Sequence, residues 1–510
     1  MPYTPSSSRL MKNTILLYFR MALLMCINLY TSRIVLEALG VEDFGIYNVV
    51  GGIVIMLGFI NDSMSVSTRR FLSYELGTGN MKRLHEVFVT SMNIHLIISL
   101  VIVILSETIG LWFVLEKMII PPERITAALW CYQVSVFTAV IDILSYPYIS
   151  AIVAHEKMKS FAFIAILDAI LKLLLVYLLL FFNYDRLIFY ALLYAGEKVL
   201  IRMVYNIYCV KTFEECKYKW LFKKDLFKEM AIFAGWNMWG NLAYVCYTQG
   251  LNMMLNVFFG SVVNAARGVA VQVQGTVGNF ANNFQMAINP QITKTYASGK
   301  LKDTHQLIYR GSRFTFCLML ILCLPLIVET PMILSIWLKE VPEGSVVFLR
   351  LLLVIVLVQK CTSPLATAVS STGQIKRYET MVNGLMLFIL PIGYLVLKFG
   401  GAPWTVFVVY LIIAILSFVV NLYIALPMME LRLIDYVRYA IKPCAVVMVL
   451  SMVVPTIMHL LVIPGMVISC LNIVFTVIAT TTICFMFGLD AEERSVFTSK
   501  ITKITRKKDD

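Results

Sequence analysis

Charged residues are scarce in this sequence. They occupy 14% of its 510 positions, whereas a soluble globular protein carries about 25%. Hydrophobic residues occupy 59%, and the mean hydropathy is +0.81. A soluble protein is therefore excluded, because most of this surface must face lipid. A cleaved signal peptide is not expected either: Arg20 interrupts the apolar run that starts at Met11, and no small-residue cleavage site follows.

Motifs of metal sites and enzymes are also missing. The eleven cysteines occur singly, with no CxxC and no His–Cys cluster, so neither disulfides nor metal ligands are expected. The sequence has no G-x-x-x-x-G-K-[ST] phosphate loop, no paired carboxylates and no nucleophile–base set. We therefore predict a transporter without a cofactor rather than an enzyme. The enzyme alternative, a membrane glycosyltransferase or polymerase, is disfavoured by the short external loops.

Apolar runs long enough to cross a membrane recur along the whole chain. A crossing helix needs about 20 mainly apolar residues. We predict an all-α integral membrane protein of about fourteen transmembrane helices, near residues 12–36, 45–72, 86–112, 124–152, 161–182, 185–210, 229–258, 262–292, 306–337, 344–372, 378–399, 404–426, 442–462 and 465–488.

Basic residues are distributed very unequally between the two sides that these spans define. One side holds 30 of the 43 lysines and arginines, the opposite side holds 6, and the rest fall within spans. Because cytoplasmic loops are enriched in Lys and Arg, we predict that both termini are cytoplasmic in a bacterial inner membrane. The net charge of +13 then reflects this anchoring and requires no nucleic acid.

The second half of the chain repeats the first. Gly79, Lys82 and His85 recur 220 positions later as Gly299, Lys302 and His305, and Gly40 recurs as Gly260. Further on, Pro147 and Lys159 match Pro364 and Lys376 at an offset of 217. Six spans separate the copies, an even number, so both halves cross in the same sense. Parallel repeats are typical of transporters whose halves rock around a central site.

These patterns together predict five regions, with two six-helix lobes in parallel repeat and two additional C-terminal helices. The regions are an N-lobe (1–210), a cytoplasmic linker (211–228), a C-lobe (229–426), two additional spans (427–488) and a basic cytoplasmic tail (489–510).

A family resemblance rests on these lobes and on two local patterns. The second span ends in Ser-Thr-Arg-Arg-Phe-Leu-Ser-Tyr-Glu-Leu-Gly-Thr-Gly, from Ser67 to Gly79, and the fourth span runs into His-Glu-Lys-Met-Lys at residues 155–159. Over residues 10–430 the chain resembles the polysaccharide transporter family of the multidrug/oligosaccharidyl-lipid/polysaccharide (MOP) exporter superfamily, and within it the Wzx-type O-antigen and capsule repeat-unit flippases. The two additional spans also occur in the related lipid II flippases, which keeps that alternative open.

Several ionisable residues fall within the predicted spans, where a charge needs a partner or a wet cavity. Asp168 and Lys172 are spaced i, i+4 and are expected to pair. Arg20 and Arg267 have no nearby carboxylate in sequence, and the resemblance implies that both face the central cavity. Arg350 is a third candidate. Asp62 and Asp142 are candidates for ion coupling.

Asparagine and glutamine are concentrated on one face of the seventh and eighth spans, with fourteen between Asn237 and Gln291. Amides offer both donors and acceptors to sugar hydroxyls; the alternative is helix–helix bonding. The predicted glycan-binding residues are Asn237, Asn241, Tyr244, Asn252, Gln274, Gln285 and Asn289.

The cationic candidates favour an anionic substrate, because a multidrug cation exporter needs unpaired acids in its cavity. The resemblance implies undecaprenyl-pyrophosphate-linked oligosaccharide, moved by alternating access for surface polysaccharide synthesis. The pyrophosphate would bind arginine and the polyprenyl tail would stay in membrane lipid. Coupling to H⁺ or Na⁺, association with a polysaccharide polymerase complex, and the alternatives of a lipid II flippase or a MATE-like cation antiporter remain open.

Overall fold

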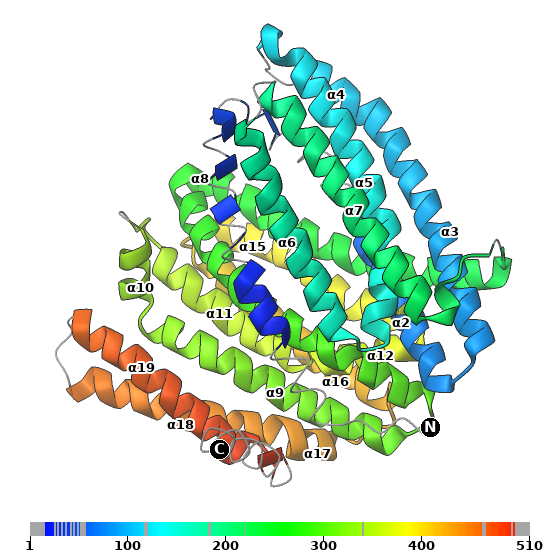
Figure 1. Cartoon of the computed structure of the whole chain (residues 1–510). Helices are drawn as coiled ribbons and strands as arrows, with labels where there is room; N and C mark the ends of the chain where they lie inside the picture. The colour runs from blue at the N-terminus through cyan, green and yellow to red at the C-terminus, as the bar shows by residue number, and fades with distance from the viewer. Residues whose placement is uncertain are drawn as a thin grey trace, which may run out of the picture. The chain divides into compact units, whose positions relative to one another are not determined.

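The computed structural model is built from α-helices, with short 3₁₀ and π turns, over the part of the chain that it describes (Figure 1). That part comprises residues 16–24, scattered positions from 27 to 50, and residues 58–116, 121–181, 185–219, 221–338, 341–461, 466–490 and 493–494. The predicted basic tail beyond residue 494 and part of the first predicted span lie outside the described residues.

Eight of the described helical segments are long and apolar enough to cross a membrane, or nine if the bent pair α11 (Ser345–Cys361) and α12 (Ser363–Thr372) forms one span. The predicted fold class, an all-α integral membrane protein, is confirmed. The predicted fourteen spans include segments that are only partly described and others in α7 (Arg186–Thr212) and α8 (Lys224–Ala297), which carry more polar residues.

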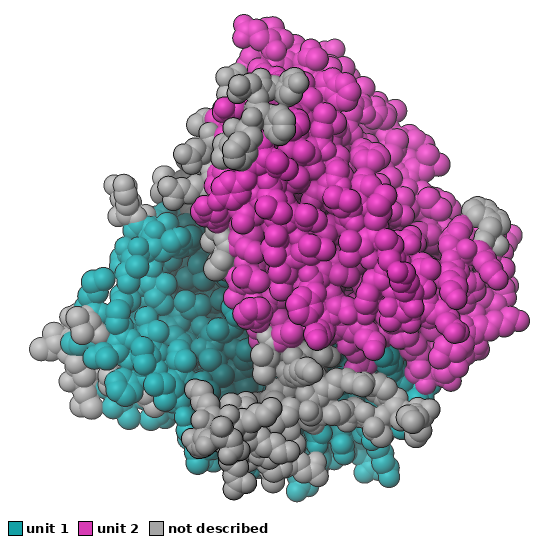
Figure 2. All heavy atoms as spheres, viewed as in Figure 1, with its two compact units in different colours: residues 1–11, 239–510 teal, residues 12–238 magenta. Residues whose placement is uncertain are grey.

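The chain divides into two compact units, coloured separately in Figure 2. The first, residues 12–238, contains α2 (Gly58–Thr78), α3 (Met81–Leu105), η1 (Ser106–Gly110), α4 (Leu111–Glu116), η2 (Pro122–Arg124), α5 (Ile125–Ala154), α6 (Met158–Phe181), α7, η3 (Glu214–Cys216) and the start of α8. Side chains cap two of these helices at their N-termini. Asn80 accepts a hydrogen bond from the Arg83 amide, and Asp185 accepts from Leu187 and Ile188.

The second unit includes residues 239–510. It contains the remainder of α8, then α9 (Leu301–Val328), α10 (Thr330–Trp337), α11, α12, α13 (Lys376–Tyr378), η4 (Glu379–Asn383), α14 (Gly384–Met386), α15 (Ile389–Lys398), α16 (Thr405–Met428), α17 (Leu433–Tyr436), η5 (Val437–Ile441), α18 (Lys442–Leu461), α19 (Met466–Ile483) and η6 (Cys484–Gly488). Its buried apolar core is formed by α8, α9, α11, α15, α16 and α18.

Helix α8 covers two predicted spans without a break at Gly260. The Arg267 guanidinium nevertheless bonds to Thr248 and Asn252, which are 19 and 15 residues earlier. In a straight helix these residues would be separated by about 22 to 29 Å along the axis. The chain must therefore reverse direction between Asn252 and Arg267, as expected for two spans joined near residue 260.

Two predicted spans differ from single straight helices. The segment predicted at 344–372 bends by 41° between α11 and α12. The bend precedes Pro364, which has no backbone N–H and starts the new helix. The segment predicted at 306–337 divides into α9 and α10 at Glu329, with Pro331 in the first turn of α10. By contrast, α5 continues through Pro147, so the two matched prolines do not mark the same geometry.

The internal repeat is visible in local backbone geometry. Gly79 and Gly299, 220 residues apart, both have left-handed φ angles, of 77° and 72°. Glu156 and Gly373, at the 217-residue offset, also share this conformation, with φ of 58° and 79°. In each case the helix ends with a residue in the conformation that closes its last turn. The repeated polar positions thus correspond to repeated helix ends.

The matched histidines make matched contacts. The His85 ring donates to the Glu215 carbonyl oxygen at 2.9 Å, and the His305 ring donates to the Met429 carbonyl oxygen at 2.8 Å. In both halves the histidine lies in the first turns of a helix, and the carbonyl belongs to the segment that leaves the sixth predicted span. Each histidine therefore binds the segment that follows the last span of its predicted lobe.

The C-terminal segment is fastened to α9 at two positions, in the middle of α9 and at its C-terminal end. The Arg313 guanidinium, 3% exposed, donates to both carboxylate oxygens of Asp490 at 2.6 Å and to Glu493 at 3.0 and 3.1 Å. At the C-terminal end of α9, buried Asn472 of α19 donates to Glu329 at 2.6 Å. These contacts hold α19 along α9, and α18 also packs against α9 (Figure 1).

Candidate functional site

Arg267 lies in the second half of α8, which packs against the core of its unit. Its guanidinium is buried and donates to the Asn252 side-chain oxygen at 3.0 Å and to the Thr248 carbonyl at 2.7 Å. The Nε atom has no hydrogen-bond partner in the structure. Among the described residues no carboxylate bonds to Arg267, so neutral acceptors orient its positive charge but do not neutralise it.

Aromatic hydroxyls surround the preceding turns of α8. Tyr247 and Tyr410 place their hydroxyl oxygens 3.3 Å apart, and Gln359 donates to Tyr410 at 3.4 Å. Tyr244, which is 57% exposed, meets the Tyr247 ring edge-on at 5.5 Å. Sequence reasoning identified Tyr244 but missed Tyr247 and Tyr410, because buried tyrosines in apolar helices carry no distinguishing sequence pattern.

A ladder of polar contacts joins the end of α8 to α11 and α12. Each contact joins residues separated by 78 positions, so the two segments run in the same direction. The pairs are Lys360–Asn282 at 2.9 Å, Gln285–Ser363, Thr367–Asn289 at 3.0 Å, and Thr293–Ser371 at 3.0 Å. The predicted glycan-binding residues Gln285 and Asn289 thus take part in interhelical bonds, the alternative that the sequence left open.

The remaining predicted amides lie along α8 in different surroundings. Asn237 donates to the Phe233 carbonyl of its own helix at 3.0 Å. Asn241 is exposed and Gln274 is partly exposed. Asn252 is engaged by Arg267. The structure therefore associates one predicted glycan residue directly with the predicted pyrophosphate residue, and it leaves Asn241, Tyr244 and Gln274 with accessible surface.

The other two predicted arginines have different partners. The Arg20 guanidinium stacks on the Phe161 ring at 4.4 Å, and its Nε and Nη1 atoms are buried without hydrogen-bond partners. Arg350 donates to the Ile327 and Val328 carbonyls at 2.8 and 3.2 Å. Those carbonyls end α9, so Arg350 caps a helix C-terminus. Arg20 resembles Arg267 in lacking a bonded carboxylate among the described residues.

The first unit contains a cluster of intramembrane charges on α5, α6 and α7. The predicted pair Asp168–Lys172 is confirmed at 2.6 Å. Lys198 lies 3.3 Å from Asp142 and 4.0 Å from Asp168. Asp142, a candidate for ion coupling, is therefore paired with a lysine. The other candidate, Asp62, is exposed on α2.

Glu197 belongs to the same cluster and is 1% exposed. Both of its carboxylate oxygens are buried without a donor in the structure. The sequence analysis predicted no site at Glu197. The signal available was its position beside Lys198, but helix neighbours point in different directions, and Lys198 bonds elsewhere.

The chain matches no family model and no curated protein, but it is similar to several solved structures. An outward-facing multidrug resistance MATE family transporter of the MOP superfamily aligns with a TM-score of 0.69 and 13% identity over 83% of this chain and 95% of that one. The Vibrio cholerae MATE transporter VcmN, in its bent form, aligns with a TM-score of 0.67 and 16% identity over 85% and 98%.

A third structure, a MOP superfamily transporter from Pyrococcus furiosus, aligns with a TM-score of 0.68 and 13% identity over 83% and 95% of the two chains. For that transporter, reverse polarity of the binding pocket has been taken to suggest a different function. At these identities the comparisons show a shared fold, that of MOP-superfamily transporters.

Proposed function

We propose that this protein is a flippase that moves undecaprenyl-pyrophosphate-linked oligosaccharide repeat units across the bacterial inner membrane by alternating access. The observation that carries the proposal is Arg267. A guanidinium within the membrane, oriented by Asn252 and Thr248 and bonded to no described carboxylate, is a ready partner for an anion. The fold shared with MOP-superfamily transporters supports a transport mechanism.

The contacts suggest a role for each candidate residue. Arg267, with Arg20 as a second candidate, would bind the pyrophosphate through the two-pronged geometry that a guanidinium offers phosphate oxygens. Accessible Asn241, Tyr244 and Gln274 would contact sugar hydroxyls and ring faces. Arg350 is assigned a capping role because its donors bond to the end of α9. Surface polysaccharide synthesis would then supply the substrate and consume the product.

Two alternatives compete with this proposal. The shared fold also suits a MATE-like cation antiporter. Asp142 and Asp168 are each within 4.0 Å of a lysine, which leaves these two acids poorly placed to bind a cation, whereas Glu197, whose carboxylate has no donor among the described residues, is the acid that would serve the antiporter. The reversed pocket polarity described for the Pyrococcus furiosus relative shows that this fold has been associated with a changed function. A lipid II flippase shares the anionic substrate chemistry and differs in the glycan.

Substitution of Arg267 tests the proposal. We expect Arg267→Ala to lower surface glycan export by at least about tenfold, since a hydrogen bond to a charged group contributes about 1.5 to 3 kcal/mol. Lipid-linked repeat units should accumulate on the cytoplasmic leaflet. Arg267→Lys should retain partial activity, because an ammonium keeps the charge but cannot make two parallel hydrogen bonds to phosphate oxygens. Arg267→Glu should retain none, because it reverses the charge. Export and membrane abundance are measured together.

Arg350→Ala is the matched control, because it removes another intramembrane arginine that bonds to carbonyl oxygens. This variant should reduce abundance and export in proportion. If Arg267→Ala is abundant and exports glycan at the parental rate, the proposed anion site is wrong. Export of cationic dyes by the parent, sensitive to Arg267→Ala, would instead favour the antiporter.

A further inference from the structure

The described residues of the linker, 211–219 and 221–228, are held against α3 and the end of α5 in their own unit. Glu215 is held twice: its carbonyl oxygen accepts from His85 at 2.9 Å, and its carboxylate lies 2.5 Å from the His155 ring nitrogen. The His155 ring also stacks on Phe213 with centroids 4.1 Å apart. The beginning of the linker therefore has a fixed position.

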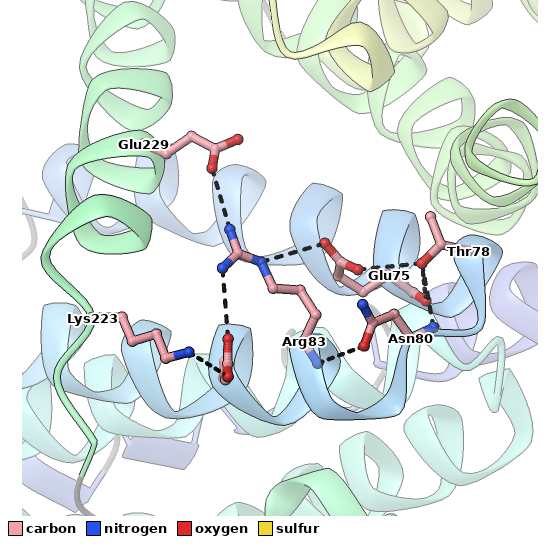
Figure 3. A network of polar contacts seen from close by, with 7 residues as sticks. Glu75, Thr78, Asn80, Arg83, Lys223 and Glu229 are labelled. Carbon is pink, nitrogen blue, oxygen red and sulfur yellow. Dashed lines mark hydrogen bonds and ion pairs between the residues drawn. The ribbon is translucent and has the colours of Figure 1, made fainter.

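Asn93 and Glu86 of α3 fix the middle of the linker. Asn93 accepts from the Tyr218 hydroxyl at 2.8 Å and donates to the Leu221 carbonyl at 2.9 Å. Lys223 donates to Glu86 at 2.6 Å. Figure 3 shows Lys223 and Arg83 in one network of polar contacts, in which Arg83 also approaches Glu229 of α8 at 3.7 Å. The linker is thus bound along just over two turns of α3, from His85 to Asn93.

These contacts also define the depth of the linker. The continuous helical segment Met81–Glu116 has 36 residues and would be about 54 Å long, well beyond a hydrocarbon core of about 30 Å. Residues 83–95 expose no apolar side chain. Exposed apolar side chains then follow at Leu96 and Ile97. Apart from Met81 at the start of the helix, exposed apolar side chains on α3 therefore begin one turn beyond Asn93, which is consistent with Tyr218 and Leu221 at the level of the headgroups.

The outward surface of the linker has the composition of a membrane interface. Lys217, Lys219 and Lys224 are exposed and form no ion pair among the described residues. Tyr218 and Phe222 are exposed by 42% and 55%. Aromatic rings and lysines at one level are typical of the headgroup region. Glu214 and Asp225 are also exposed. The linker sequence nevertheless contains six lysines and only three acidic residues, so its net charge is positive.

We propose that the linker binds anionic phospholipid headgroups of the cytoplasmic leaflet, with Lys217, Lys219 and Lys224 contacting the phosphates and Tyr218 and Phe222 inserted between the headgroups. The hydrogen bonds of Asn93 and Glu215 pre-order this surface, so lipid binding does not have to order the chain. The proposal rests on the predicted cytoplasmic location of the linker and is independent of the substrate that is transported.

Lipid titrations of the purified full-length protein in detergent test this surface. The probes are fluorescent phosphatidylglycerol, which is anionic, and phosphatidylethanolamine, which is zwitterionic. A basic residue near an anionic surface contributes about 1 kcal/mol, so the triple variant K217Q/K219Q/K224Q should bind phosphatidylglycerol at least about tenfold more weakly. Its weak binding of phosphatidylethanolamine should not change.

The matched control is K82Q/K157Q/K302Q, which removes three other exposed lysines on the predicted cytoplasmic side. It should retain parental affinity for phosphatidylglycerol. Equal losses in the two triple variants, or no loss in either, would refute a specific surface. Titration with undecaprenyl phosphate distinguishes the two possible lipids. If K217Q/K219Q/K224Q lowers the affinity for undecaprenyl phosphate alone, the surface binds the transported lipid, and the phospholipid proposal is wrong.

Discussion

At the scale of single residues, the intramembrane arginines divide by the kind of oxygen that they bind. Arg313 binds two carboxylates, Arg350 binds the carbonyls at a helix end, and Arg267 binds one amide and one carbonyl. Only a carboxylate cancels the charge of the guanidinium. The same residue type therefore anchors added helices at one position, caps a helix at another, and remains cationic at a third.

Strained backbone at Glu430 gives a prediction at this scale. Glu430 is exposed and has φ of 54°, just after the C-cap of α16, where residues other than Gly and Asn are disfavoured. Glu430→Gly should stabilise the protein by about 0.5 to 1 kcal/mol, since the left-handed conformation costs a residue with a Cβ atom about that much or more. Thermal unfolding of purified protein measures the change.

The control is Glu430→Gln, which removes the charge but keeps the Cβ atom. The thermal unfolding midpoint of Glu430→Gln should equal that of the parent protein. If Glu430→Gln stabilises the protein as much as Glu430→Gly, charge rather than backbone conformation determines the effect.

At the scale of helices and their connections, polar contacts set the register between neighbours. The ladder between α8 and α11–α12 keeps a constant offset of 78 residues across the 41° bend. In lipid, where burial of apolar surface does not drive helix association, such bonds specify which faces meet. The bend at Pro364 therefore occurs within a fixed contact and does not separate the two segments.

The fastening of α19 to α9 predicts a dependence on pH. The Arg313 guanidinium holds the pKa of the Asp490 carboxyl below its ordinary value, which is about 3.9 in an unfolded chain. A depressed pKa stabilises the folded state at pH values above the unfolded pKa, and this contribution disappears as the pH falls through the folded pKa. We expect the unfolding midpoint of the parent to decrease below about pH 4.

Asp490→Asn should have a lower midpoint at pH 7 and a shallower decrease in acid, because it removes the titrating group. Unfolding followed from pH 7 to pH 3 in a mild detergent checks both. An Asp490→Asn variant whose acid profile parallels the parent would show that other carboxylates control the pH dependence.

At the scale of the whole molecule, composition and periodicity predicted the helical membrane class, the pair Asp168–Lys172 and the repeat. These follow from local rules: lipid requires apolar runs, and residues four apart share a helix face. The bend before Pro364, the ladder partners of Gln285 and Asn289, and the burial of Glu197 could not be predicted. Each depends on which helices meet, and the pattern along one helix shows that it has a polar face without identifying the helix that packs there.

Orientation is the prediction that belongs to the whole chain, motivated by the asymmetry of 30 to 6 basic residues. Reporter fusions after Lys219 and Lys302 should be cytoplasmic, and a fusion after Gly260 should be periplasmic. The Arg267–Thr248 contact already requires a reversal near Gly260. A periplasmic reporter at Lys219 would invert the assignment and remove the basis for lipid binding by the linker.

The histidine contacts that end each lobe have an evolutionary consequence. His85 and His305 donate to backbone carbonyl oxygens, of Glu215 and Met429, and every residue type supplies such an oxygen. A duplicated lobe could therefore keep its fastening while the fastened segment changed freely in sequence. The segment after the first contact carries the lysines and aromatic residues of the linker, whereas the segment after the second continues as Glu-Leu-Arg-Leu into the next helix. The same hydrogen bond to a backbone carbonyl oxygen is therefore compatible with different side chains in the two bound segments.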